Sequence, residues 1–516
     1  MDVVVRLLLR PWVVISAAAF LGIFLYQRIR LLIQLRHIKG PLLSRVTGIP
    51  HIRALLSPNC QDWYYDRNLT YGELVVVSPT KLLTSSPELW TRMNQDYGYT
   101  KSRWYYRAVR YDVHNDNLFT QMDNVKHDER RKMMIRGYSG AENLTLETDI
   151  EECIVKLLHL IRSRYTGSQR KPMDLAEKIE FFTLDVISTI GFGKCFNLLN
   201  TNKDPNGYVK STHVGLEINN RQIALGTWWM NELPFFQPKK GTDVKDTSGF
   251  KKMRALNASM VAAREVEFRE QKEKNGGVVP RADMLTSFMR HGLAGKDLQT
   301  ENILQIVAGA DTTGGALKGT FMYVTTNPRV YKALQAEIDD AVASGAAPAA
   351  PGIITAMQAK GLPYLQAVIR ESMRMFPPVN NPLSRTTPPA GDTVTIEGKE
   401  VYIPGGVCVL PSFKAMHRNK RVYGDDADVF RPERWIDEKD KKKLEAMKHE
   451  QNIAFGHGRW LCLGKAIALR ELGVAVFELF RHFDWTLVNP EKPFKDCTLT
   501  GLHVTTDMWV QVDERK

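Results

Sequence analysis

Cysteine is scarce in this sequence: six stand among 516 residues, at positions 60, 153, 195, 408, 462 and 497. No two of them form a C-x-x-C pair, which excludes a zinc ribbon and a thioredoxin-like redox motif. Sparse, unpaired thiols are typical of a reducing compartment. A cysteine with a special role must therefore be recognised by its neighbours.

Other signals are missing as well. The sequence has no Pro/Ser-rich linker, no internal repeat and no G-x-G-x-x-G fingerprint, which favours one large body without its own dinucleotide site. Lys and Arg number 70 against 57 Asp and Glu, a net charge of +13, yet no compact basic run with interleaved aromatics occurs. We therefore expect no nucleic-acid partner. The basic excess favours a membrane surface or an acidic protein partner instead.

A membrane anchor is predicted at the N-terminus. The 17 residues from Pro11 to Gln27 carry no charge, close to the lower limit for a spanning helix. No small-x-small cleavage site follows, which favours an uncleaved anchor over a signal peptide. Arg28, Arg30, Arg36 and Lys39 follow the apolar run, whereas only Arg6 and Arg10 precede it. This excess of basic residues after the run predicts that the main body lies in the cytosol. We expect residues 1–40 to be anchor and basic linker, and residues 41–516 to be the catalytic domain.

The sequence after the anchor predicts a helix-rich body with minor sheet. Apolar residues at helical spacing predict helices over Glu147–Arg164, Asp174–Ile190, Asp297–Thr326, Pro363–Met375 and Leu463–His482. Strand patterns are fewer: Gly72–Pro79, a hairpin over Thr393–Gly406, and a pair formed by Trp485–Val488 with Met508–Val512. Ser344–Gly352 is expected to be a surface loop. Asp437–Gln451 is expected to be a solvated charged segment rather than a docking site.

One cysteine does have unusual neighbours, in the stretch FGHGRWLCLG from Phe455 to Gly464. A thiolate that binds iron needs positive potential, backbone donors and little water. Glycines at 456, 458 and 464 would take positive φ and let the backbone approach a flat ligand. A helix starting near Cys462 would point free N–H groups at the sulfur, and Phe455 would shield the ligand. A buried structural cysteine after a glycine-rich turn explains the same residues equally well.

Three further patterns are ambiguous when each is taken alone. Glu371 and Arg374 share a helical face at i,i+3, which is usually only a surface ion pair. His127 and Arg131 lie at i,i+4 and fit an ordinary charged helix face. AGADTTGG, Ala308 to Gly315, fits a small-residue packing stripe, although its composition is poor for a helix.

Together these stretches resemble the cytochrome P450 family, and they follow one another in the family's order. FGHGRWLCLG resembles the haem-binding loop Phe-Gly-x-Gly-x-Arg-x-Cys-x-Gly, and Glu371-Ser372-Met373-Arg374 resembles E-x-x-R. FRPERW, His127 to Arg131 and AGADTTGG resemble the family's remaining motifs. The resemblance implies the P450 fold, mainly α with minor β sheets, and haem b held by the Cys462 thiolate between the long oxygen-site helix and the cysteine loop.

The resemblance also implies roles for individual residues. Arg434 would join Glu371 and Arg374 in a buried network that holds the cysteine loop. His127, Arg131 and Arg385 would contact the haem propionates. The sequence departs from the family two residues before the cysteine, where a basic residue is usual and Trp460 stands instead. Either Arg459 reaches the propionate or the Trp460 indole N–H replaces it, and the sequence leaves this open.

AGADTTGG resembles the family's oxygen-activation motif. Ala308 and Thr312 share a face at i,i+4, and Ala308 and Gly309 leave room for dioxygen and substrate. Thr312 would hydrogen-bond near the reacting oxygen, and Asp311 would supply protons. Four regions would contact substrate: Lys101–Leu118, Gly309, Val379–Leu383 and Leu499–Leu502.

The function implied is a membrane-anchored monooxygenase of the endoplasmic reticulum, using dioxygen and electrons from NADPH-cytochrome P450 reductase. Details of the motifs resemble filamentous-fungal enzymes of specialised metabolism, the pisatin demethylase-like group among them. That implies an apolar terpenoid, polyketide or alkaloid-like substrate. Two alternatives stay open: a haem-thiolate isomerase or dehydratase that does not use dioxygen, against which Asp311 and Thr312 argue, and a non-catalytic haem or lipid carrier at the membrane.

Overall fold

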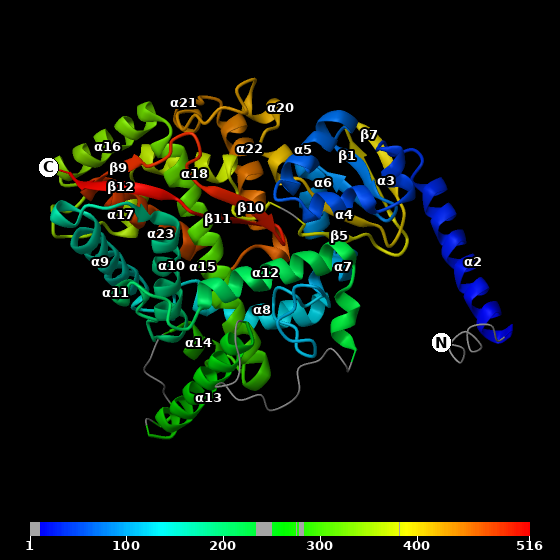
Figure 1. The fold of residues 1–516 in the computed structure, drawn as a ribbon, viewed down its shortest axis with the longest axis horizontal. Helices are drawn as coiled ribbons and strands as arrows, with labels where there is room; N and C mark the ends of the chain where they lie inside the picture. Colours follow the sequence, from blue (N-terminus) through cyan, green and yellow to red (C-terminus); the bar gives the residue numbers. More distant parts are fainter. Residues whose placement is uncertain (1–10, 234–249, 275, 278–282, 381, 516) are drawn as a thin grey trace.

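The computed structural model describes residues 11–233, 250–274, 276–277, 283–380 and 382–515. Arg6 and Arg10, which entered the predicted orientation of the anchor, lie outside the described residues. Helices dominate the body and the strands form small sheets among them, as expected for the predicted fold class (Figure 1).

The described helices are α2(Pro11–Gln34), α3(Leu42–Val46), α4(Ile49–Leu56), α5(Cys60–Tyr71), α6(Pro87–Gln95), α7(Arg103–Tyr106), α8(Asn124–Tyr138), α9(Leu146–Tyr165), α10(Leu175–Phe192), α11(Leu198–Thr201), α12(Tyr208–Leu225), α13(Phe250–Lys274), α14(Met284–Arg290), α15(Gly295–Thr325), α16(Pro328–Ala343), α17(Ala356–Lys360), α18(Pro363–Met375), α19(Phe413–Met416), α20(Lys420–Tyr423), α21(Arg434–Asp437), α22(Lys441–Asn452) and α23(Lys465–His482). The five helices predicted from periodicity correspond to α9, α10, α15, α18 and α23, with ends that agree within two residues.

The main hydrophobic core lies where α9, α10, α15, α18 and α23 pack together. Glycines let α15, which has 31 residues, approach α10 closely. A Cβ at Gly309 would lie 2.7 Å from Ile187 Cδ1, and a Cβ at Gly314 would lie 3.4 Å from Thr183 Oγ1. This close approach offsets the poor intrinsic helix propensity of the AGADTTGG stretch, because packing rather than propensity decides the stability of a buried helix.

The strands are β1(Leu74–Ser78), β2(Lys81–Thr84), β3(Thr100–Lys101), β4(Met173–Asp174), β5(Arg385–Thr386), β6(Asp392–Ile396), β7(Lys399–Ile403), β8(Cys408–Pro411), β9(Phe483–Leu487), β10(Lys495–Leu499), β11(Leu502–Thr506) and β12(Trp509–Glu514). They form sheets in the orders β1-β2-β8-β5-β3, β4-β12-β9, β10-β11 and β6-β7. The predicted hairpin is β6-β7, and its turn residues Glu397 and Gly398 have φ of 50° and 77°. The predicted late pair is β9-β12, in which Val510 faces Leu487.

One expected segment differs. Part of Asp437–Gln451, predicted to be solvated, forms α22, whose inner face buries Met447, Glu450 and Gln451. The sequence did not indicate this buried face, because its few inward residues are spaced about one turn apart among many lysines and glutamates.

α2 projects away from the body (Figure 1). Its stretch Val14–Gln34 has 21 residues, a mean hydropathy of 1.4 and no buried residue, so it is long and apolar enough to cross a membrane. The chain joins the body just after it: Leu35 and Ile38 are buried with β1 residues, and the Val76 N–H donates to the Lys39 carbonyl at 2.9 Å.

Candidate active site

A cavity of about 640 Å³ lies in the interior and is walled mainly by apolar side chains. Most of the predicted site residues line it, although they come from distant parts of the chain. They are Ala308, Thr312, Cys462, His127, Arg131, Arg385, Phe455, Gly456, Trp460 and Gly464. Asp311 and Arg459 are not among the lining residues.

The cysteine loop is a tight turn that requires two of its glycines. The Cys462 N–H donates to the Phe455 carbonyl at 2.7 Å, which closes the turn. Gly456 has φ +81°, and a Cβ there would collide with the Trp460 carbonyl oxygen. Gly458 has φ +57°, and a Cβ there would lie 2.8 Å from the Asn94 carbonyl oxygen. Both positions therefore exclude any side chain.

The prediction of positive φ at Gly464 is wrong. Its φ is −78°, because it is the residue that precedes the first turn of α23. A Cβ at Gly464 would lie 3.9 Å from Cys462 Sγ, on the cavity wall. Because Gly464 has no side chain, space stays open beside the sulfur. Its backbone conformation is one that any residue can adopt.

Cys462 presents its sulfur to the cavity. Surrounding protein raises the pKa of the thiol by desolvation, and the N–H groups of Gly464 and Lys465 oppose this rise, as do the charges of Arg131 and Lys465. The donors at the start of α23 therefore point at the sulfur as predicted. A metal ion at the sulfur would replace the thiol proton, because thiolate is the ligand form.

Basic side chains gather on one wall of the cavity. The Arg131 Nη1 donates to the Leu461 carbonyl at 2.7 Å and so also fixes the cysteine loop. Arg385 is buried and donates to Tyr106 Oη at 2.7 Å and Asn94 Oδ1 at 2.8 Å, while its Nε has no partner among the described residues. Lys101, whose role the sequence did not indicate, is buried on the same wall and donates to the Leu118 carbonyl at 2.8 Å. This excess of cations fits a ligand that carries carboxylates.

His127 is buried on this wall too, with its Nδ1 3.0 Å from Asp128 Oδ1. Burial, together with the charge of Lys101, lowers the pKa of His127 to about 3. The imidazole is therefore neutral at physiological pH and donates through only one nitrogen. Because the Asp128 carboxylate can only accept, that nitrogen is Nδ1, and Nε2 is left as an acceptor without an N–H for a ligand.

The two candidates for the missing basic residue have different surroundings. The Arg459 guanidinium lies over the Tyr97 ring, 3.4 Å from its centroid, and 3.9 Å from Asp128 Oδ2. Arg459 does not line the cavity, and its Nη1 and Nη2 are buried without a hydrogen-bond partner among the described residues. Trp460 lines the cavity, and its Nε1 has no hydrogen-bond partner among the described residues. Arg385 lies over the Trp460 ring at 4.2 Å. Arg385 and Trp460 thus each leave a buried N–H without a partner, which is an arrangement that a bound acceptor would complete.

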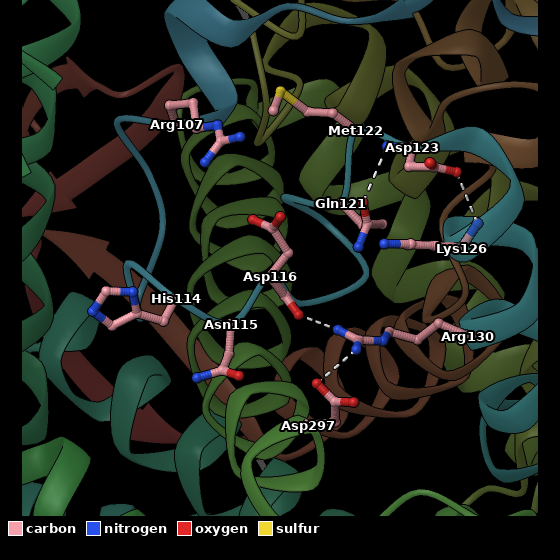
Figure 2. A pocket seen from close by; sticks show the side chains of 10 residues that line it. All are labelled: Arg107, His114, Asn115, Asp116, Gln121, Met122, Asp123, Lys126, Arg130 and Asp297. Atoms are coloured by element: carbon pink, nitrogen blue, oxygen red, sulfur yellow. Dashed lines mark hydrogen bonds and ion pairs between the residues drawn. The ribbon is translucent and has the colours of Figure 1, made fainter. Parts of the chain in front are cut away.

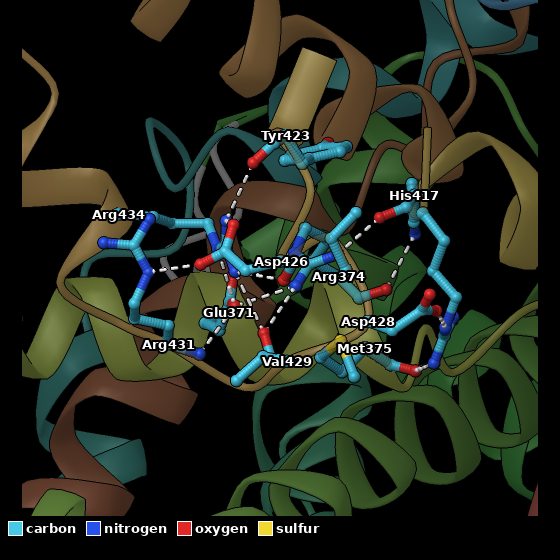
Figure 3. A network of polar contacts seen from close by, with 12 residues as sticks. Glu371, Arg374, Met375, His417, Tyr423, Asp426, Asp428, Val429, Arg431 and Arg434 are labelled. Atoms are coloured by element: carbon cyan, nitrogen blue, oxygen red, sulfur yellow. Dashed lines mark hydrogen bonds and ion pairs between the residues drawn. The ribbon is translucent and has the colours of Figure 1, made fainter. Parts of the chain in front are cut away.

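Glu371, Arg374 and Arg434 meet in a fully buried network (Figure 3). Glu371 accepts from Arg374 Nε and Nη2 at 2.9 and 2.8 Å and from Arg434 Nε at 2.9 Å. Burial would raise the pKa of Glu371, but hydrogen bonds and the charges of both arginines outweigh it and lower the pKa. The surface ion pair considered for Glu371 and Arg374 is therefore excluded.

Further partners of this network were missed in the sequence. Trp435 Nε1 donates to Glu371 Oε2 at 2.9 Å, and Arg434 Nη1 pairs with Asp426 Oδ1 at 3.0 Å. Arg374 Nη1 donates to the carbonyls of His417 and Ala427, both at 2.6 Å. Because carbonyls and distant side chains carry no sequence pattern, only the fold could reveal them. The network ties α18 to the 417–435 segment, which leads through α22 to the cysteine loop.

Thr312 and Asp311 face different surroundings. The Thr312 hydroxyl donates to the Ala308 carbonyl at 2.7 Å and lies on the cavity wall. Asp311 Oδ2 is buried without a partner among the described residues. Burial and the nearby Glu180 carboxylate raise the pKa of Asp311 to about 7, against the opposing effect of His213 and Lys318.

Each of the four predicted substrate regions contributes to the cavity wall, through Val109, Gly309, Val379, Leu383 and Leu502 among others. Asn381, inside one of these regions, lies outside the described residues. The sequence missed α12, which adds Thr212, Leu216 and Asn219, and α10, which adds Ile187 and Ile190. These residues belong to ordinary amphipathic helices, so no motif could mark them.

A second pocket, of about 560 Å³, is polar and lies beside α8 and the start of α15 (Figure 2). Arg130 crosses it, with Nη2 2.7 Å from Asp297 Oδ1 and a further bond to the Asp116 carbonyl. None of the predicted cofactor contacts lines this pocket.

This chain is similar to known proteins of one family. Residues 68–507 match the family model "Cytochrome P450". The chain is 36% identical over 451 residues to cytochrome P450 monooxygenase ABA1 of Pyricularia oryzae, covering 86% of this chain and 84% of the relative. It is 32% identical over 457 residues to aba1 of Botryotinia fuckeliana, covering 87% and 86%.

A more distant relative is pisatin demethylase of Fusarium vanettenii, 26% identical over 468 residues, covering 90% of this chain and 87% of the relative. The family match spans both the cavity and the cysteine loop. The chain therefore belongs to the cytochrome P450 family of haem-thiolate enzymes and is a cytochrome P450 monooxygenase.

Proposed function

We propose that this enzyme oxidises an apolar small molecule with dioxygen, using haem b held by Cys462. The observation that carries the proposal is the Cys462 sulfur, which opens onto the same cavity as Thr312 and receives N–H groups from the start of α23. The iron of the bound haem would supply the activation of dioxygen. The side chains around it would bind, orient and move protons.

The basic wall is the proposed contact for the haem propionates. Arg131 and Arg385 supply positive charge, and the neutral His127 lies beside them with its Nδ1–H directed at Asp128. Trp460, rather than Arg459, would take the position of the usual basic residue, because Trp460 lines the cavity and Arg459 does not. Lys101 adds a further buried cation on this wall. Phe455 and Gly464 would bound the ring beside the sulfur.

Proton supply is the proposed task of Asp311 and Thr312. Asp311 has a free buried carboxyl oxygen and a pKa near neutrality, so it can both hold and release a proton at pH 7. Thr312, the next residue, lies on the cavity wall and can pass a hydrogen bond to the reacting oxygen. Ala308 and Gly309 leave the required space beside it.

The substrate is proposed to be a terpenoid, polyketide or alkaloid-like compound of fungal secondary metabolism. The cavity is lined mainly by apolar side chains, which bind such molecules by burial of apolar surface. The relatives named above are fungal monooxygenases.

Residues 1–40 are proposed as the anchor and linker, and residues 41–516 as the catalytic domain on the cytosolic side of the endoplasmic reticulum. The apolar helix α2 supports this arrangement. NADPH-cytochrome P450 reductase is the proposed electron donor, and an acidic docking face on it would suit the net charge of +13.

The proposal is tested with the haem-loaded protein, reductase and a panel of apolar substrates. We expect dioxygen and NADPH to be consumed together with product formation. Conversion of a substrate without dioxygen or NADPH would show an isomerase or dehydratase. Tight binding of a substrate without turnover would show a carrier. Either result would overturn the proposal.

Trp460→Phe is expected to weaken haem retention. Losing one N–H donor to a charged group costs about 1.5 kcal/mol or more, which corresponds to about a tenfold faster loss of haem. The measurement is the rate of haem transfer to an acceptor apoprotein. Arg459→Met serves as the matched control and should change the rate by less than about twofold. A larger effect of Arg459→Met than of Trp460→Phe would reverse the assignment.

Coupling of NADPH use to product is expected to fall as pH rises through neutrality. Because the pKa of Asp311 is raised to about 7, its acid form predominates below that pH and is lost above it. Product per NADPH should be measured between about pH 6 and about pH 8. In Asp311→Asn, product per NADPH should not change with pH. Thr312→Ala should lower product per NADPH at every pH, because electrons are diverted to peroxide. A wild-type slope that persists in Asp311→Asn would remove this carboxyl from proton supply.

A further inference from the structure

A buried glutamate of α15 lies between the polar pocket beside α8 and the cavity that holds Cys462. Asp297 lines the polar pocket, and Gln305, further along α15, lines the cavity. Glu301 stands midway between them, is 0% exposed and lines neither space. Because the three residues are at i, i+4 and i+8, their side chains form one row along the helix from the pocket to the cavity.

The partition between the two spaces is thin at Glu301. Asp116 lines the polar pocket, and Leu118, two residues later, lines the cavity. The Leu118 N–H donates to Glu301 Oε1 at 2.6 Å. On the pocket side, Arg130 Nη1 lies 3.3 Å from Glu301 Oε1, and Arg130 Nη2 lies 2.7 Å from Asp297 Oδ1 (Figure 2). Glu301 therefore contacts the cavity wall on one side and the ion pair of the polar pocket on the other.

Two buried oxygen atoms of this row have no hydrogen-bond partner among the described residues. One is Glu301 Oε2, since the donors from Leu118 and Arg130 are both directed at Oε1. The other is Gln305 Oε1, which belongs to a side chain that is 2% exposed and whose Nε2 lies 3.6 Å from Met284 Sδ. Buried polar atoms are normally hydrogen-bonded. A proton on Glu301 Oε2 and a water molecule between the two oxygens would satisfy both.

The surroundings of Glu301 favour its protonated form at pH 7. Burial raises the pKa of Glu301 to about 8, against the opposing charge of Arg130, and the charge of Asp297 adds to the rise. Lys101 and Tyr138 are further titratable groups whose charges interact with Glu301. An acid whose pKa is this close to neutrality can hold a proton and also release it.

We propose that the polar pocket, Glu301 and Gln305 form a second route by which protons enter the cavity, separate from Asp311. Glu301 Oε2 passes its proton to water held by Gln305 Oε1 and so to the cavity. Water in the polar pocket then returns a proton to the carboxylate, so that the protein itself is unchanged after each transfer. The route rests on the proposed function, because reduction of dioxygen takes up protons together with the electrons from NADPH.

The first measurement uses the Asp311→Asn background, in which the route through Asp311 is closed. Product per NADPH is measured between about pH 6 and about pH 9 with haem-loaded protein, reductase and an apolar substrate that the wild-type enzyme converts. It should be constant up to about pH 8 and fall at higher pH, as Glu301 loses its proton. Adding Glu301→Gln should lower it about tenfold at pH 7 and remove the fall, because an amide cannot release a proton.

Glu450→Gln is the matched control in the same background. Glu450 is also buried, its pKa is raised to about 9 by burial, and its Oε1 has no partner among the described residues. Because Glu450 lines neither the polar pocket nor the cavity, its replacement should leave product per NADPH and the fall above about pH 8 unchanged. Equal product per NADPH in Asp311→Asn with and without Glu301→Gln would overturn the proposal.

Gln305→Met tests the cavity end of the route and leaves the contacts of Glu301 with Arg130 and Leu118 in place. In the Asp311→Asn background it should lower product per NADPH as Glu301→Gln does, because the acceptor beside the cavity is lost. An effect of Glu301→Gln without an effect of Gln305→Met would overturn the connection to the cavity.

An infrared measurement tests the route without turnover. The difference spectrum between the haem-loaded wild type and Glu301→Gln at pH 7 should contain the C=O band of a protonated carboxylic acid. In D2O this band should shift without unfolding, because the polar pocket connects Glu301 to solvent. A missing band, or one that exchanges only on unfolding, would overturn the route. A wild-type enzyme that forms no product from dioxygen and NADPH would instead overturn the proposed function, and the infrared result would still decide whether Glu301 exchanges protons with solvent.

Discussion

Cys462→Ser is expected to abolish product formation and the thiolate-type carbon monoxide spectrum of the reduced protein. The Cys462 sulfur is the cavity-lining thiol that receives N–H groups from the start of α23. A serine hydroxyl in the same place remains protonated and cannot donate the electron density of a thiolate to iron. The spectrum of the purified, reduced variant under carbon monoxide is the direct measurement.

Cys497→Ser is the matched control for this change. Cys497 lies on β10 and does not line the cavity, so its replacement should leave both the spectrum and turnover unchanged. If Cys462→Ser keeps the thiolate spectrum, the ligand assignment is wrong. If Cys462→Ser binds no haem while Cys497→Ser binds haem normally, the comparison shows that haem binding needs Cys462 and does not need Cys497.

Glu371→Gln is expected to destabilise the fold by about 3–5 kcal/mol, because removing one partner leaves buried charges uncompensated. Arg374 and Arg434 both direct N–H groups at this carboxylate, and the side chains of Glu371 and Arg374 are 0% exposed. The amide keeps the shape but removes the negative charge between two guanidinium groups. Urea unfolding followed by tryptophan fluorescence, together with the rate of haem loss, measures the effect.

A surface pair of the same spacing provides the comparison. Glu445 and Lys448 are also at i,i+3, but their side chains are 71% and 35% exposed. Glu445→Gln should therefore cost much less stability than Glu371→Gln, because solvent and salt screen an exposed ion pair. Equal costs for the two substitutions would mean that the buried network contributes nothing beyond an ordinary surface ion pair. Faster haem loss in Glu371→Gln alone would support its proposed role in holding the cysteine loop.

Local sequence rules determined five of the described helices, the hairpin β6-β7 and the ends of several elements. Pro363 begins α18 and the turn Glu397-Gly398 joins β6 to β7, as predicted, because capping and turn chemistry act over a few residues. The glycines at 456 and 458 were predicted to have positive φ for the same reason. Gly464 failed this prediction, since the start of α23 governs its backbone and no local signal separated the three glycines.

The sequence by itself determined that Glu371 and Arg374 share a helical face, that Ala308 and Thr312 share another, and that glycines surround Cys462. Only the tertiary structure decided that the Glu371 pair is buried and that Trp460 rather than Arg459 lines the cavity. The physical reason is the range of the interactions. Spacing along one helix or turn follows from backbone geometry, whereas burial and the meeting of distant side chains depend on how whole helices pack.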